Sequence, residues 1–143
     1  MPHVSGLNAA RTGSGSATPA ESHQAEKSAT SEIAGMRVTP KLQRHSGDSY
    51  GYRFESGGRA VVYSTDSEHK LEEPAETATF VEFFRDADVV IFDAMYSLAE
   101  AVSVKEDWGH SSNIIGVELC QMAGARHLVL FHHEPANDDA TLD

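Results

Sequence analysis

The chain has 143 residues, enough for one domain, and carries a formal net charge of −11 at pH 7. This acidic balance, without a cluster of lysines and arginines, disfavours a nucleic-acid partner, because binding to phosphates requires clustered cations. The single cysteine, Cys120, excludes an intrachain disulfide, and no apolar run reaches membrane-spanning length, so we expect a soluble, cytoplasmic protein without a membrane partner.

Residues 1–35 are predicted to form a disordered tail. Ser, Ala, Gly and Thr occupy 20 of these 35 positions, and no aromatic residue is present. Such a segment cannot bury enough apolar surface to offset the entropy that it loses on ordering. It also lacks the basic start and the continuous apolar core of a signal peptide. The sequence thus predicts one folded part, residues 36–143, that follows a tail.

The folded part is expected to begin with antiparallel strands. Residues 37–43 and 50–55 have strand character, and the polar residues 46–49 between them favour a turn. Residues 56–58, Ser-Gly-Gly, are a hairpin signal, because two glycines tolerate the positive φ angles of a tight turn. Residues 59–63 are then expected to form the returning strand.

Helices and strands are expected to alternate in the rest of the chain. Pro74 suits the first turn of a helix, where its missing N–H has no partner to lose. Ser111 or Ser112 is expected to cap a later helix that Gly124 ends. The apolar run 89–92 is typical of a strand buried on both faces. The expected elements are a helix from Pro74 to Arg85, a strand over 89–92, a short helix over 97–107, a helix ending at Ala123 and a strand over 127–131.

Three potential metal ligands stand at or just beyond the ends of strand-like runs. They are His45 in LQRHSGDSYGYRF, Asp66 in VVYSTDSE and His132 in LVLFHHEP. A strand end holds an imidazole or a carboxylate on a rigid element and lets it point into a cleft, as a metal site requires. Taken singly, each has a simpler explanation: a surface histidine, a turn-forming aspartate and a buried, hydrogen-bonded histidine.

Together, these segments resemble the metallo-β-lactamase superfamily, in its ribonuclease Z-like and phosphodiesterase-like branch. In that branch a histidine stands six residues before the glycine of a GYR strand, as His45 does here. A strand then ends in a Y-S/T-x-D-T/S turn, matched by residues 63–67. A GHS turn follows, matched by residues 109–111, and an apolar strand ends in a histidine, matched by His132. The resemblance covers residues 36–139.

The resemblance implies an α+β fold, namely the C-terminal half of an αββα sandwich. It also implies that His45, Asp66 and His132 are metal ligands, with Asp66 bridging two ions through its two carboxylate oxygens. Histidine and carboxylate ligands suit zinc, and manganese or iron are the alternatives.

The resemblance gives His110 the role of a proton donor near the scissile phosphate, which suits an imidazole because its pKa is near neutral. The alternative is that Gly-His-Ser-Ser only opens a helix. Glu68 and His69, just after the Asp66 turn, are expected to be solvated. His133 is expected to point away from the site, because side chains alternate along an extended segment.

Two departures from the family limit what the chain can be expected to do. The first metal motif of the family, HxHxDH, is absent, since the only earlier histidines are His3 and His23. The chain is therefore expected to be inactive alone. Residues 93–96 stand where ribonuclease Z has a HEAT segment, which disfavours a role in transfer-RNA processing.

The expected complete form is a metal-dependent hydrolase that cleaves a phosphodiester or related ester of a small-molecule substrate with a metal-bound hydroxide. Two alternatives remain open. The chain could be a non-catalytic remnant that serves as an interaction module, or one half of a split hydrolase completed by a partner chain that carries the missing N-terminal half.

Overall fold

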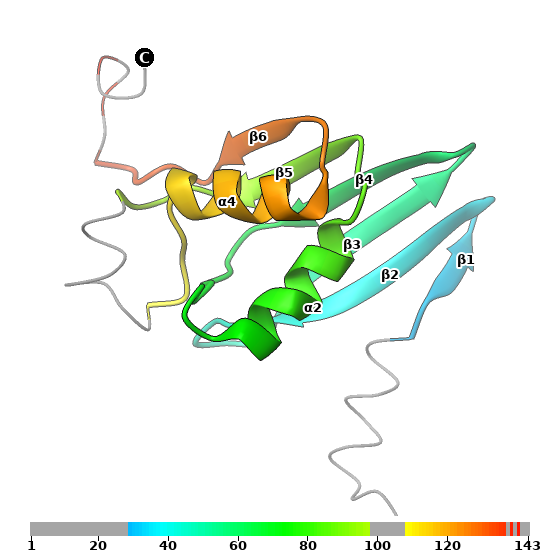
Figure 1. Ribbon diagram of the computed structural model, residues 1–143, viewed down its shortest axis with the longest axis horizontal. Coiled ribbons are helices and arrows are strands. Elements are labelled where there is room, and N and C mark those ends of the chain that lie inside the picture. The colour runs from blue at the N-terminus through cyan, green and yellow to red at the C-terminus, as the bar shows by residue number, and fades with distance from the viewer. Residues whose placement is uncertain (1–28, 98–107, 137, 139, 141–143) are drawn as a thin grey trace, which may run out of the picture.

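The computed structural model describes residues 29–97, 108–136, 138 and 140. These residues form one mixed sheet with the strand order β1-β2-β3-β4-β5-β6 and two helices, α2 and α4, which both lie over the same face (Figure 1). The elements are β1 (Ser31–Ile33), β2 (Met36–Gln43), β3 (Ser49–Ser56), β4 (Arg59–Ser64), α2 (Pro74–Phe84), β5 (Val89–Asp93), α4 (Asn113–Ala123) and β6 (Leu128–Phe131).

The first four strands pair antiparallel and the last three pair parallel. Gly57 and Gly58 both have positive φ, 57° and 74°, which suits the tight hairpin between β3 and β4. The two parallel steps need long crossover connections, and these contain α2 and α4. This arrangement confirms the predicted α+β fold and places the carboxyl ends of β4, β5 and β6 at one rim.

The core lies between the two helices and strands β4 and β5. Val62, Val90, Phe92 and Leu119 are fully buried there. Helix α4 approaches β5 closely at Gly116, where a Cβ would lie 2.6 Å from the Phe92 ring. Apolar burial on this one face is the main source of stability in the described part of the chain.

Helix α4 has the predicted caps. The side chain of Ser112 accepts a hydrogen bond from the backbone N–H of Ile115, and Gly124 ends the helix with φ of 69°. Helix α2 begins at Pro74 as predicted and ends at Phe84. These local signals therefore fix the ends of both helices at or next to the predicted residues.

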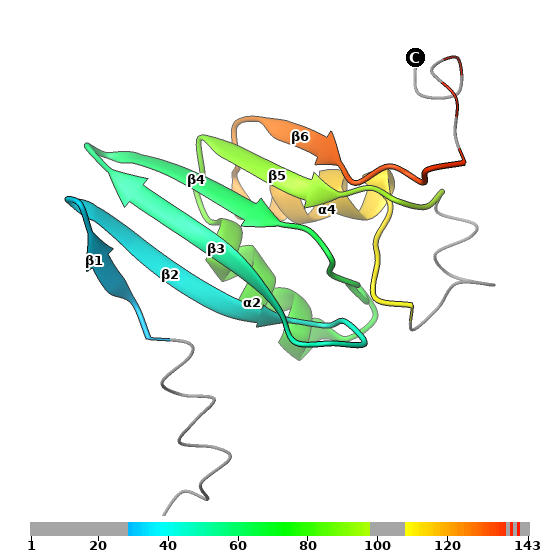
Figure 2. The same ribbon diagram turned by 180° about the vertical axis from the view of Figure 1, so that it is seen from behind.

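The face of the sheet opposite the helices is not covered by any described element (Figure 2). Strand pairing sets Tyr52 beside Tyr63, Tyr63 beside Ile91, and Ile91 beside Val129, so these side chains share that face. We call this surface the open face. Its large apolar side chains Tyr52, Tyr63, Val129 and Phe131 are between 37% and 49% exposed.

The prediction that the run 89–92 is buried on both faces was wrong. Val90 and Phe92 are buried under the helices, whereas Val89 and Ile91 on the open face are only half-buried. The strand has the composition of a two-sided core strand, but the described residues cover only one side of it. A second layer over the open face would restore the burial that the composition predicts.

The boundary of the folded part lies earlier than residue 36. Strand β1 falls inside the predicted tail, while residues 1–28 of that tail and residues 98–107 of the predicted short helix lie outside the described residues. No helix in the described ranges is long and apolar enough to cross a membrane. A cytoplasmic location stays a prediction.

Candidate metal centre

Four potential ligands meet at the carboxyl rim of the parallel strands. Asp66 follows β4, Asp93 ends β5, His132 follows β6, and His110 comes from the loop before α4. One ligand atom from each lies within 4.8 Å of the others. Parallel neighbouring strands carry their carboxyl ends to a common edge, which explains how residues far apart in sequence converge. We call these four residues the rim cluster.

Asp93 organises the rim cluster from beneath. Its side chain is fully buried, and its Oδ2 accepts a 2.9 Å hydrogen bond from the backbone N–H of Asp66. The same oxygen lies 2.9 Å from Nδ1 of His110 and 3.3 Å from Nδ1 of His132. The other oxygen, Oδ1, accepts from two backbone N–H groups, those of Met95 and Ser111. The hydrogen bonds that Asp93 accepts offset the cost of burying its carboxylate. The carboxylate in turn orients both imidazole rings.

Asp66 and His132 both adopt left-handed backbone conformations, with φ of 54° and 58°. Residues other than glycine rarely occupy this region, and strained backbone is concentrated at functional sites. In both cases the chain leaves its strand and turns sharply at the ligand. Nδ1 of His132 lies 3.7 Å from Oδ1 of Asp66 as a result, so the two side chains face each other.

His45 lies beside the rim cluster, not within it. Its ring centroid is 5.4 Å from that of His110, edge to face. Its Nδ1 accepts a 3.2 Å hydrogen bond from the N–H of Gly47, which places the proton of a neutral ring on Nε2. Coordination of a metal through Nε2 would require this bond to break, because Nδ1 would then carry the proton. The structure thus brings Asp66, His110 and His132 together and leaves His45 at the margin.

The donor set of the rim cluster suits a divalent ion. Two carboxylates and two imidazoles are the mixed oxygen and nitrogen ligands that zinc, manganese and iron accept. In a tetrahedral site with bonds of about 2.0–2.2 Å, two ligand atoms of one zinc ion lie about 3.3–3.6 Å apart. The ligand atoms of the rim cluster lie up to 4.8 Å apart, so some of them would have to move closer together to bind the same ion. Asp66 and His132 face each other and can supply two ligands of an ion, whereas the Asp93 carboxylate is occupied by its own hydrogen bonds. A complete catalytic centre would need further ligands.

Glu68 and His69 are buried, which contradicts the prediction that they are solvated turn residues. The His69 ring packs against Phe80, Phe84 and Phe92 at centroid distances of 4.3, 6.3 and 5.1 Å. Desolvation in this aromatic surrounding is the largest cause that lowers the pKa of His69 to about 3, so the ring is neutral at pH 7.

Sequence reasoning also missed Asp93 as a site residue. A signal was available, because Asp93 ends an apolar strand in the same way as Asp66 follows one. No local signal marks Glu68 or His69 as buried, since their burial depends on α2 and the loop before α4. His133 is exposed and does not belong to the rim cluster.

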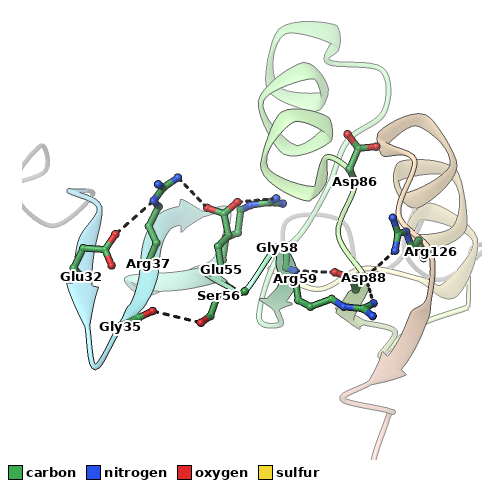
Figure 3. Close-up of a pocket in the computed structure, with 13 residues that line it drawn as sticks. Glu32, Gly35, Arg37, Glu55, Ser56, Gly58, Arg59, Asp86, Asp88 and Arg126 are labelled. Carbon is green, nitrogen blue, oxygen red and sulfur yellow. Dashed lines mark hydrogen bonds and ion pairs between the residues drawn. The ribbon is translucent and has the colours of Figure 1, made fainter.

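A cavity of about 550 Å³ lies away from the rim cluster, around the β3–β4 hairpin and the start of β5 (Figure 3). Its arginines are matched by carboxylates: Arg59 and Arg126 lie 2.9 and 3.0 Å from Asp88. Balanced charges and distance from the ligands separate this cavity from the candidate metal centre.

Comparison of the sequence with known proteins identifies the family of this chain. Residues 8–133 match the family described as the β-lactamase superfamily domain. A ribonuclease Z from Acaryochloris marina (strain MBIC 11017) is 36% identical over 78 residues, which are 54% of this chain and 22% of that protein.

Two solved structures share the fold. The metallo-β-lactamase fold protein YhfI from Bacillus subtilis is 22% identical with a TM-score of 0.67, over 81% of this chain and 44% of that one. The short form of human tRNase Z is 21% identical with a TM-score of 0.61, over 78% of this chain and 41% of that one. The chain spans less than half the length of each of these relatives.

Proposed function

Because the chain belongs to the metallo-β-lactamase superfamily, as a ribonuclease Z-like member, we propose that it supplies one side of the metal centre of a hydrolase that cleaves a phosphodiester or related ester. The observation that carries this proposal is the convergence of Asp66, Asp93, His110 and His132 at the carboxyl rim of the sheet. Zinc is the proposed ion, with manganese or iron as alternatives for the same donor set.

In this proposal Asp66 and His132 hold the ion, and Asp93 orients the imidazoles. A bound divalent ion would lower the pKa of a coordinated water and stabilise negative charge on the substrate. His110 keeps Nδ1 toward the Asp93 carboxylate at 2.9 Å, so its Nε2 is the atom that can donate a proton to a leaving oxygen. The buried carboxylate would stabilise the imidazolium that carries this proton.

A small phosphodiester is the proposed substrate class. The chain has a net charge of −11, and the described cations are largely paired with carboxylates, as around the cavity of Figure 3. Such a surface offers little attraction to a long polyanion. The Asp-Ala-Met-Tyr segment at residues 93–96, in place of HEAT, also supports a substrate other than transfer RNA.

The open face suggests how the centre is completed. Exposed Tyr63 and Phe131 lie on it with ring centroids 6.3 Å apart, close in sequence to Asp66 and His132. An apolar face of this kind is typical of a surface that another protein layer covers. We propose that polypeptide outside the described residues, in a partner chain or in a longer form of this one, covers it and adds the missing ligands.

The test compares metal binding and hydrolysis in the same preparations. The chain should bind about one zinc ion by titration calorimetry, yet show little or no turnover of bis-p-nitrophenyl phosphate with zinc or manganese. His132→Ala should weaken zinc binding at least about tenfold, whereas His133→Ala, at the adjacent exposed histidine, should leave it unchanged. Equal loss in both variants, or no zinc binding by the unchanged chain, would contradict the proposal. An interaction module without a metal role would then be favoured.

A further inference from the structure

Glu68 connects the loops that carry three of the candidate site residues. It lies two residues after Asp66, and its backbone N–H donates a 2.9 Å hydrogen bond to the carbonyl of Arg44, the residue before His45. This bond ties the His45 loop to the Asp66 turn. The connection uses only the backbone, so it would survive most substitutions of the side chain.

The Glu68 carboxylate makes a second connection, to the His110 loop. Its Oε2 accepts a 3.2 Å hydrogen bond from the N–H of Gly109, the residue before His110. Its Oε1 lies 3.6 Å from Nζ of Lys70, and both side chains are at most 14% exposed. A buried carboxylate is costly unless it is paired and hydrogen-bonded, and here these two contacts contribute to the compensation.

Gly109 links the Glu68 carboxylate to His45. It has φ of +88°, and a Cβ on it would lie 2.5 Å from Cδ2 of the His45 ring and 3.1 Å from Cα of His45. The backbone of Gly109 thus packs directly on His45 while its N–H is held by Glu68. A shift of the Gly109 backbone would therefore displace both His45, which packs against it, and His110, which directly follows it in the chain.

We propose that Glu68 is a positioning residue that holds His45 and His110 at fixed places relative to Asp66. The His110 loop contacts Asp93, and Asp93 in turn contacts His132 and the backbone of Asp66, so Glu68 also helps to preorganise the two residues that hold the ion. The expected effect on zinc affinity rests on the proposed function, whereas the expected effect on the positions of His45 and His110 rests only on the contacts of Glu68. Outer-shell partners that orient ligands typically contribute about 10–100-fold to metal affinity.

The test uses the full chain with two substitutions at one position and a matched control. Glu68→Ala removes the acceptor and should lower zinc affinity about 10–100-fold. Glu68→Gln keeps an amide oxygen that can accept from Gly109 and should restore the affinity to within about threefold of the unchanged chain. Glu72→Ala, an exposed carboxylate in the following turn, should have no effect.

Nuclear magnetic resonance of the same proteins provides the readout that a general loss of stability would not give. The Gly109 amide and the ring signals of His45 and His110 should shift together in Glu68→Ala and stay near their original positions in Glu68→Gln. Unchanged ring signals and zinc affinity in Glu68→Ala would overturn the proposal, as would Glu68→Gln behaving like Glu68→Ala in a folded protein.

Failure of the proposed function would look different. If the unchanged chain binds no zinc, the metal role falls, while the coupled shifts of Gly109, His45 and His110 still decide whether Glu68 positions them. If Glu68→Ala does not fold, Glu68→Gln decides: retained ring signals support the positioning role, and displaced ring signals overturn it.

Discussion

Acidification should destabilise the fold through His69. The pKa of this buried ring is about 3, whereas an exposed histidine in the unfolded chain has a pKa of 6.5. Between these two values the unfolded state binds more protons than the folded state, so the free energy of unfolding falls as the pH falls. The stabilisation is fully present above pH 6.5 and is lost progressively toward pH 3.

The size of the effect follows from the same two pKa values. Each pH unit well inside this window changes the free energy of unfolding by about 1.4 kcal/mol. The loss between pH 7 and pH 5 should be about 2 kcal/mol, and the whole window corresponds to roughly 5 kcal/mol. Desolvation is the largest cause of the low pKa; the charge of Asp93 opposes it, and those of Lys41 and Arg44 add to it.

Urea denaturation at pH 7, 6 and 5 measures this contribution when the unchanged chain is compared with His69→Phe. Phenylalanine keeps an aromatic ring among Phe80, Phe84 and Phe92 but cannot titrate. The unchanged chain should lose about 2 kcal/mol more than His69→Phe over this range. The exposed-histidine variant His133→Ala should follow the unchanged chain. Parallel pH profiles for the unchanged chain and His69→Phe would refute the reasoning.

Three further predictions concern packing, the buried carboxylate and activity. Gly116→Ala should destabilise the fold by about 1–3 kcal/mol, measured by thermal denaturation, because its Cβ would lie 2.6 Å from the Phe92 ring. Asp93→Asn should lower the free energy of unfolding by about 1–3 kcal/mol, because an amide cannot accept from all the donors that face both carboxylate oxygens. The same substitution should weaken zinc binding, and an unchanged zinc affinity by calorimetry would contradict this. The chain alone should show little or no turnover of bis-p-nitrophenyl phosphate. Turnover that Asp66→Ala abolishes would contradict this and show that the rim cluster needs no further ligands.

The elements that local chemistry specifies were predicted closely. The Gly57–Gly58 hairpin, the Pro74 helix start, and the Ser112 and Gly124 caps each depend on a few neighbouring residues, and the structure confirms them. The resemblance to the metallo-β-lactamase superfamily, based on ordered strand-end motifs, is confirmed by the match over residues 8–133.

The parts that failed depend on contacts between distant segments. Burial of Glu68 and His69 requires the loop before α4 and the aromatic face of α2, and no pattern near the Asp66 turn encodes either. The half-burial of Val89 and Ile91 reflects the open face, which a strand composition cannot reveal. The metal roles of His45, Asp66 and His132 and the proton-donor role of His110 stay predictions, although three of these residues lie together.

X-ray absorption spectroscopy at the zinc edge, on the zinc-loaded chain, tests the metal centre most directly. We expect nitrogen and oxygen neighbours of the zinc ion at about 2.0–2.2 Å, with the outer-shell scattering of imidazole rings. This imidazole signal should decrease in His132→Ala and remain in His133→Ala. A zinc spectrum without imidazole scattering, or one that His132→Ala leaves unchanged, would contradict a metal centre built on Asp66, Asp93, His110 and His132.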